Sequence, residues 1–228
     1  MGVAGPQGRE RASREAIDSE NRVIRCAKTA GPLPLPGISR HRAGTAADFA
    51  RQHSCLFRFS NGMPAITIRP YRAADAVTLA RLFQASVWQV ASRDYTPSQV
   101  RAWAPDIMDA RRFGERCESK STWVAEVGGC IAGFSDLEPD GHVDMLYVHP
   151  DFERRGVARA LLEHLEKMAR GSNYRRLYTE ASITARPVFE ALGFRVIVPQ
   201  SVTLRGEAMT NYRMEKRLDA GPARKDPT

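Results

Sequence analysis

The chain lacks several features that would assign it to a specialised class. No apolar run approaches the roughly 20 residues of a membrane span, so no membrane partner is expected. The N-terminus has arginines but no apolar stretch, which argues against a secretory signal. The four cysteines include no C-x-x-C pair, and no histidines stand at zinc-finger spacing. We therefore expect a cytoplasmic protein without a metal centre.

Acidic residues are scarce near the N-terminus, where the excess positive charge is concentrated. The whole chain has 34 Lys and Arg against 26 Asp and Glu, a net charge of +8. Residues 1–62 hold 10 Lys and Arg against 5 Asp and Glu, whereas residues 63–218 hold 22 Lys and Arg against 19 Asp and Glu. Since the later part is only mildly basic, we expect no nucleic-acid partner for it.

Residues 1–62 also lack apolar periodicity and are rich in Arg, Ala, Gly and Pro. Such a segment cannot bury enough surface to offset its ordering entropy. Three interpretations stay open: a disordered basic arm, an organelle transit peptide, or residues translated upstream of a true start at Met63. Its acidic residues weaken the transit peptide. We expect one folded domain over residues 63–218 and a disordered tail over 219–228.

From Met63 the pattern alternates between strands and helices. Helices are expected after Asp75, from the Thr96-Pro97-Ser98-Gln99 capping box, and over Asp106–Glu118, Val157–Ala169 and Ala185–Leu192. Strands are expected over Ala65–Arg69, Thr122–Val127, Cys130–Leu137, His142–Val148, Leu177–Ala181, Phe194–Val198 and Ala208–Leu218. This order predicts an α/β protein with a mixed sheet and helices on its faces.

The most informative segment is Val143–Ala169, where a strand is followed by a charged turn and an amphipathic helix. Gly156 permits a tight turn, and the first N–H groups of a helix have no intrahelical acceptor. Nearby arginines add positive charge at the end of the helix dipole where a cation is unfavourable unless an anion binds. The pattern indicates a phosphate site. A surface helix with solvated arginines is the alternative.

Three separated blocks of sequence point to one family. VDMLYVHPDFERRGVARALL resembles the acetyl-CoA-binding motif of the GNAT N-acetyltransferase superfamily, whose loop reads Gln/Arg-x-x-Gly-x-Gly/Ala. SITARPVFEALGFRV resembles the following helix and Gly-Phe strand. The three separated blocks SVWQVASRDYTPSQVRAWAP, TEASITARPVFEALGF and RGEAMTNYRMEK are similar to a branch of small bacterial members. The resemblance runs from about Ile66 to Leu218. It implies a mostly antiparallel mixed sheet that splays between its fourth and fifth strands.

The resemblance also implies acetyl-CoA as co-substrate and assigns residues to it. The pantetheine arm would pair with the backbone of Leu146, Tyr147 and Val148. The pyrophosphate would bind the loop and first helical turn, namely Arg154, Arg155, Gly156, Val157, Ala158 and Arg159, and Thr184 stands where an asparagine is common. Two residues depart from the family pattern. Glu153 replaces Gln or Arg, and Phe189 replaces a tyrosine that many members use as general acid.

Acyl transfer to an amine needs a neutral amine, a path for its proton and a polarised thioester carbonyl. His142 and Asp144 lie two apart on an expected strand, hence on one face, and are candidates for the base or for substrate binding. An ordinary turn residue and a structural acceptor are the alternatives. Without a tyrosine at 189, the acid would be solvent, Tyr147, Tyr178 or Tyr212. Asp94 and Tyr95, between two early helices, are the candidates for the acceptor pocket.

The sequence thus favours an enzyme that moves an acetyl group directly from acetyl-CoA to a primary amine of a small molecule or protein. Two other classes stay open. One is a CoA-binding regulatory or toxin-neutralising module without turnover, which Phe189 favours. The other is a nucleic-acid-associated protein that uses residues 1–62. The oligomeric state is not determined by the sequence, and a homodimer is compatible with it.

Overall fold

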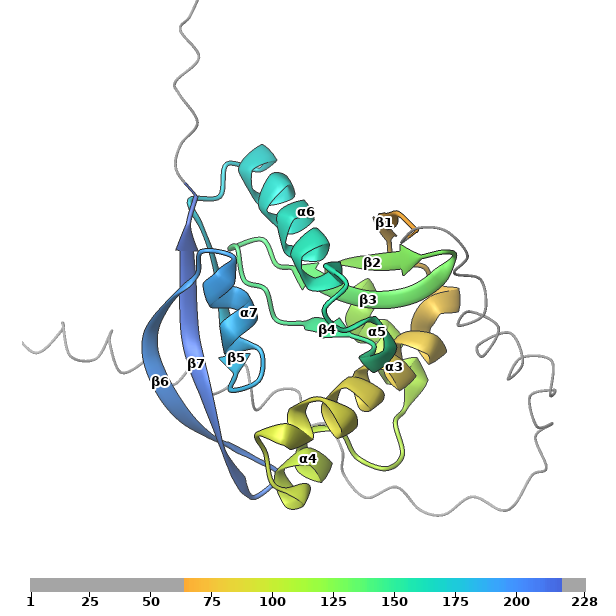
Figure 1. Ribbon diagram of the computed structural model, residues 1–228, viewed down its shortest axis with the longest axis vertical. Coiled ribbons are helices and arrows are strands. Elements are labelled where there is room, and N and C mark those ends of the chain that lie inside the picture. The colour runs from red at the N-terminus through yellow and green to blue at the C-terminus, as the bar shows by residue number, and fades with distance from the viewer. Residues whose placement is uncertain (1–63, 219–228) are drawn as a thin grey trace, which may run out of the picture.

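The computed structural model describes residues 64–218, and the expected N-terminal extension and C-terminal tail lie outside them (Figure 1). The strands of this part form two antiparallel sheets, with orders β1-β2-β3-β4 and β5-β7-β6. The strands are β1 (Ile66–Pro70), β2 (Ser121–Val127), β3 (Cys130–Leu137), β4 (Leu146–Val148), β5 (Arg176–Ser182), β6 (Arg195–Leu204) and β7 (Glu207–Arg217).

Helices cover both faces of the first sheet, and α4 and α7 pack against the second (Figure 1). The helices are α3 (Ala76–Gln89), α4 (Pro97–Trp103), α5 (Ala110–Glu118), α6 (Val157–Gly171) and α7 (Arg186–Ala191). Successive side chains of a strand point to opposite faces of the sheet, so each strand contributes to the packing on both faces. Val124 and Phe134 belong to the core beneath α3 and α5, whereas Ala125 and Ala132 pack against α6.

The two sheets meet near the beginning of β5 and then part. His142 and Tyr178 form a parallel bridge, in which Val143 N donates to Tyr178 O (2.8 Å) and Tyr178 N donates to Gly141 O (3.0 Å). The close approach of the chain at residue 141 to β5 requires glycine, since a Cβ there would lie 2.3 Å from Arg176 O. Beyond the bridge β4 pairs with β3 alone and β5 with β7 alone. The expected split between the fourth and fifth strands is therefore present.

Helix α6 is held close to the first sheet by its apolar stripe. The buried residues are Val157, Leu161, Leu162, Leu165 and Ala169, and each large one contributes about 1.5–3 kcal/mol of burial free energy. A Cβ at Gly133 would lie 2.8 Å from Val157 Cγ1 and 2.9 Å from Tyr147 O, so this glycine permits the close approach. Met168, expected on the same stripe, is 38% exposed. The packing places the N-terminus of α6 beside the edge of β4.

Three expected element boundaries were wrong, each because of a side-chain hydrogen bond or a turn. Helix α5 starts at Ala110 instead of Asp106, since the Asp109 side chain caps it by accepting from Arg112 N (3.1 Å). The strand expected from His142 starts at Leu146, because Asp136 Oδ1 accepts the N–H groups of Asp144 and Met145 (3.0 and 2.8 Å). Strand β6 runs on to Leu204, where a turn at Arg205 and Gly206 leads into β7.

Candidate active site

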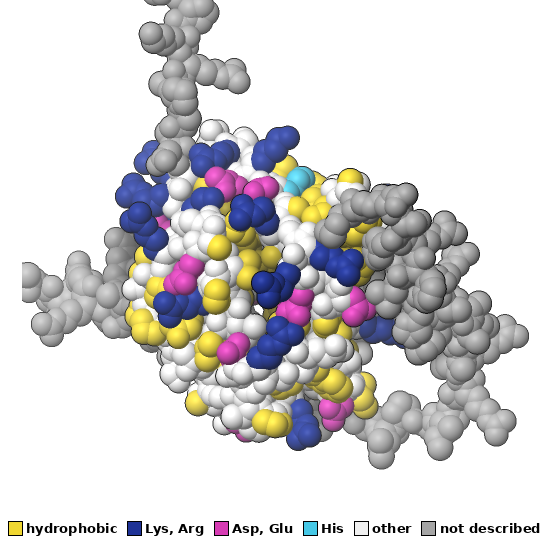
Figure 2. All heavy atoms as spheres, viewed as in Figure 1, with side chains coloured by type: hydrophobic (Ala, Val, Ile, Leu, Met, Phe, Trp, Pro, Cys, Tyr) yellow, Lys and Arg dark blue, Asp and Glu magenta, His cyan; other side chains and the backbone are white. Residues whose placement is uncertain are grey.

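A cleft of about 750 Å³ occupies the split between the two sheets. Nine of the ten residues expected to hold a cofactor line it: Leu146, Tyr147, Val148, Arg154, Gly156, Val157, Ala158, Arg159 and Thr184. The exception is Arg155, whose guanidinium lies 5.5 Å from the centre of the Phe152 ring. Figure 2 shows acidic and basic side chains together around the hollowed middle of this face.

One end of the cleft is formed by the N-terminus of α6. Gly156 is the N-cap residue and adopts φ = +81°, a left-handed conformation that favours glycine. Arg154, two residues earlier, also has a positive φ of 59°. The first-turn N–H groups of α6 have no intrahelical acceptor, and they lie at the positive end of the helix dipole. This end of the cleft therefore suits a phosphate group.

Glu153 would repel an anion at this position if it were unpaired. Instead, both of its carboxylate oxygens accept from the guanidinium of Arg93, at 3.0 and 2.8 Å. Arg93 belongs to the short turn after α3, so the pair links the end of α3 to the segment before α6, and both residues line the mouth of the cleft. Hydrogen bonding to Glu153 also raises the pKa of Arg93. The departure from the family's usual residue is therefore compensated within the chain.

Strand β4 supplies backbone groups to the cleft wall. It pairs with β3 along one edge, at the partners Gly133–Val148, Phe134–Tyr147 and Ser135–Leu146. Its other edge faces the split, where Leu146, Tyr147 and Val148 line the cleft. A strand edge of this kind can pair with an extended ligand that carries amide groups.

A network of charged side chains lies at the β4–β5 wall. Lys120 Nζ bonds Asp144 and Glu138 Oε1 (2.6 Å) and lies 3.6 Å from Asp136 Oδ2. Arg116 donates to Asp144 Oδ2 at 2.6 Å. Burial opposes ionisation of Asp144, but the charges of Arg116 and Lys120 outweigh it and lower its pKa. Asp144 lines the cleft and is ionised at neutral pH.

His142 is a correction to the sequence analysis. It precedes β4, does not share a strand face with Asp144, and is absent from the cleft wall. Its ring is 6% exposed and lies between Glu138 Oε2 (3.3 Å from Nδ1) and Glu180 Oε2 (2.7 Å from Nε2). Burial lowers its pKa, but the two carboxylates prevail and raise it to about 10. A histidine that is protonated at neutral pH is not a base there.

Glu180 is the cleft carboxylate that sequence reasoning missed. It lies in the middle of β5, where the neighbouring Leu177 and Ala181 are buried in the core under α7. Strand alternation places Glu180 on the other face. A charged residue inside an expected strand, with a buried residue directly before and after it, is the signal that would have identified it.

The tyrosines and Phe189 differ in their relation to the cleft. Tyr147 lines it, and burial raises its pKa. Tyr178 OH donates to Asp140 Oδ2 (2.6 Å), and the ring of Tyr212 lies under the Arg186 guanidinium at 4.7 Å; neither is among the lining residues. Phe189 lines the cleft and packs edge-on to Phe194, 5.0 Å between ring centres.

Tyr95, expected in the acceptor pocket, is a core residue in the structure. It is 6% exposed, its hydroxyl donates to Thr210 O (2.6 Å), and it accepts from Ile183 N (2.9 Å). Both hydrogen bonds tie the loop before α4 to the second sheet. The adjacent Asp94 is at the surface and accepts from Thr184 Oγ1 at 2.6 Å. Asp94 thus contacts the cleft wall through Thr184.

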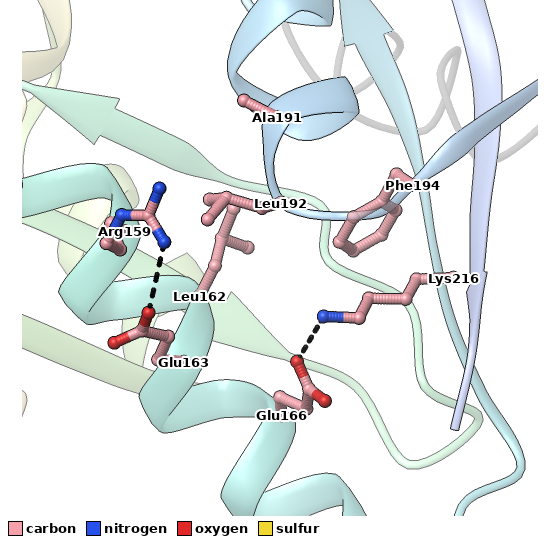
Figure 3. Close-up of a pocket in the computed structure, with 8 residues that line it drawn as sticks. All are labelled: Arg159, Leu162, Glu163, Glu166, Ala191, Leu192, Phe194 and Lys216. Carbon is pink, nitrogen blue, oxygen red and sulfur yellow. Dashed lines mark hydrogen bonds and ion pairs between the residues drawn. The ribbon is translucent and has the colours of Figure 1, made fainter. Parts of the chain in front are cut away.

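A smaller cavity of about 250 Å³ opens between α6 and α7 (Figure 3). It shares Arg159, Ala191 and Leu192 with the cleft and is closed by Lys216 of β7. Two ion pairs, Arg159–Glu163 and Lys216–Glu166, cross its wall (Figure 3). The cavity therefore extends the cleft along α6.

Within residues 64–218, no helix is long and apolar enough to cross a membrane.

Comparison with known proteins agrees with this geometry. A family model described as an acetyltransferase (GNAT) domain matches residues 91–216. The uncharacterised N-acetyltransferase YafP of Escherichia coli is 39% identical over 150 residues, which cover 65% of this chain and 94% of YafP.

Solved structures give the same result. A GCN5-related N-acetyltransferase of Rhodopseudomonas palustris shares 36% identity, with a TM-score of 0.65, over 70% of this chain and 99% of that one. The yncA protein of Salmonella typhimurium, solved with its cofactor acetyl-CoA, shares the fold at 20% identity. Its TM-score is 0.53, over 70% of this chain and 97% of that one.

Proposed function

Because the chain belongs to the GNAT acetyltransferase family, we propose that it transfers an acetyl group from acetyl-CoA to a primary amine of a small molecule or protein. The observation that carries this proposal is the cleft between β4 and β5, which combines a free strand edge with the N-terminus of α6. Family membership supports the acyl-transfer chemistry, and this cleft supports the use of an acyl-CoA.

The residues at the cleft fit the parts of acetyl-CoA. First-turn N–H groups after Gly156 suit its pyrophosphate, and the edge of Leu146–Val148 suits the amide groups of its pantetheine arm. Acetyl-CoA supplies an activated acyl group as a thioester. A backbone N–H of β4 donates to the thioester carbonyl and so stabilises the negative charge that develops on its oxygen.

The remaining chemistry concerns protons. The acceptor must lose a proton before its nitrogen can attack, and the cleft carboxylates Asp144 and Glu180 are the groups placed to attract its ammonium form. Since burial raises the pKa of Tyr147, its hydroxyl is a poor donor to a thiolate. Solvent therefore protonates the departing sulfur, and a tyrosine at position 189 is not required.

Turnover is the test of this proposal. The full chain is incubated with acetyl-CoA and a panel of primary amines, and free thiol and acetylated product are measured together. Matched thiol release and product formation would support the proposal. Acetyl-CoA binding without turnover of any amine would instead favour the non-catalytic CoA-binding module, for which Phe189 is the supporting observation.

A further inference from the structure

We propose that Glu180 binds the ammonium group of the acceptor and takes its proton, and that His142 is the positioning residue that orients Glu180. This inference rests on the proposed function, since it assigns roles within the same cleft. It also specifies the acceptor as an aliphatic amine that enters the site protonated.

The first support is the position of Glu180. Its strand, β5, belongs to the second sheet, and Glu180 lines the cleft together with Asp144 and the β4 residues of the first sheet. Neighbouring Ala181 packs into the core beneath α7, so Glu180 lies on the opposite face of β5.

The second support is the way in which Glu180 is held. One oxygen, Oε2, lies 2.7 Å from His142 Nε2, while the side chain keeps 25% of its surface exposed. His142 is fixed by its stacking on Tyr178, at 4.7 Å between ring centres, and by Glu138 on its other nitrogen. The histidine therefore fixes the orientation of the carboxylate, while Glu180 remains part of the cleft lining.

The third support is the charge of the surrounding network. It contains four carboxylates and three basic groups, namely Asp136, Glu138, Asp144 and Glu180 with Arg116, Lys120 and His142. The carboxyl of Asp144 is already bonded by both Arg116 and Lys120. One further positive charge balances the network, and a substrate ammonium at Glu180 provides it.

The proton balance of the step is simple. The ammonium group gives one proton to Glu180, which passes it to water. The neutral nitrogen then forms the C–N bond to the acyl carbon as the C–S bond breaks, and a second nitrogen proton is lost to solvent. Solvent returns a proton to the sulfur, so the products are the N-acetyl amine, the free thiol of CoA and one proton.

The main test compares Glu180→Gln with Glu215→Gln. Both remove a carboxylate from an ion pair on the second sheet, and the two side chains are equally accessible, at 25% and 26%. Glu215 lies outside the cleft lining and pairs with Arg176. We expect E180Q to lower kcat/KM for the amine roughly 100-fold with the KM for acetyl-CoA unchanged, and E215Q to match the wild type.

Two further variants, at Glu180 and at His142, separate the chemical roles of these residues from a purely structural role. Glu180→Asp keeps the charge and should recover part of the activity that E180Q loses. His142→Gln should lower kcat about 10-fold. Its KM for acetyl-CoA should not change, because His142 lies outside the cleft lining. A folded His142→Gln variant with the wild-type kcat would reduce His142 to a structural residue and overturn its role.

The outcomes distinguish this inference from the function on which it rests. If the wild type acetylates amines and E180Q is as active as E215Q, the role of Glu180 is overturned while the proposed function stands. If the wild type acetylates no amine, the proposed function fails, and the inference fails with it.

Discussion

Arg93 and Glu153 form a two-point ion pair at the mouth of the cleft, with nitrogen–oxygen distances of 3.0 and 2.8 Å. Arg93 follows α3, and Glu153 precedes the loop into α6. The pair neutralises the acidic residue that directly precedes Arg154 and Arg155. Its role is therefore electrostatic as well as structural.

Arg93→Ala should raise the KM for acetyl-CoA several-fold, because it leaves the Glu153 charge unpaired beside the phosphate site. The double variant Arg93→Ala/Glu153→Gln should recover most of the loss, since the repulsive charge is then absent. Steady-state kinetics on Arg93→Ala, Glu153→Gln and the double variant give the coupling between the two residues in their effect on the KM for acetyl-CoA. Additive effects would show that the pair does not act on the cofactor.

Gly156→Asp should abolish measurable acetyl-CoA binding, since it adds a carboxylate where first-turn N–H groups face the cleft. The matched control is Gly206→Asp in the β6–β7 turn, which has φ = +88° against +81° at Gly156. Both should lose about 1–2 kcal/mol of stability from left-handed strain. Calorimetric titration with acetyl-CoA separates them, and equal affinities would contradict the placement of the phosphate site.

Tyr95→Phe should lower the free energy of unfolding by about 1–3 kcal/mol, because Thr210 O and Ile183 N each lose their hydrogen bond to the hydroxyl. The KM for the amine should not change at temperatures where the variant is folded. Urea denaturation and kinetics together test this assignment. A large change in KM with unchanged stability would return Tyr95 to the acceptor site.

His142 should make stability depend on pH above neutrality. Its pKa rises from an ordinary 6.5 to about 10 on folding, so its contribution is complete below pH 6.5 and is lost as pH rises toward 10. Urea denaturation of the wild type should therefore show falling stability between pH 6.5 and 9. The His142→Gln variant should be less stable at pH 6.5, on the order of 3 kcal/mol, and should lack this part of the slope.

The fold and much of the cleft lining were predictable because their signals are local. The glycine at 156, the apolar stripe of α6 and the Gly-Phe strand after α7 are read directly from neighbouring residues. The family resemblance that these segments carry named ten residues, of which nine line one cleft; their binding of acetyl-CoA stays a prediction. The Thr96–Gln99 capping box is also local, and its two reciprocal hydrogen bonds are present at 2.9 and 3.3 Å.

The surroundings of His142 were not predictable because they are assembled through the fold. Glu138 and His142 lie four residues apart after β3, whereas Glu180 comes from β5, and the two carboxylates together set the protonation of the histidine. The strand expected from His142 failed for a similar reason, since the Asp136 side chain takes the N–H groups of Asp144 and Met145. Residue spacing alone does not reveal such long-range hydrogen bonds.

The most direct measurement of the central claim follows free CoA thiol and acetylated product when the full chain is mixed with acetyl-CoA and a panel of primary amines. The account predicts that at least one aliphatic amine gives thiol and N-acetyl product in equal amounts, at a rate that Gly156→Asp abolishes. Tight binding of acetyl-CoA with no product from any amine would contradict it.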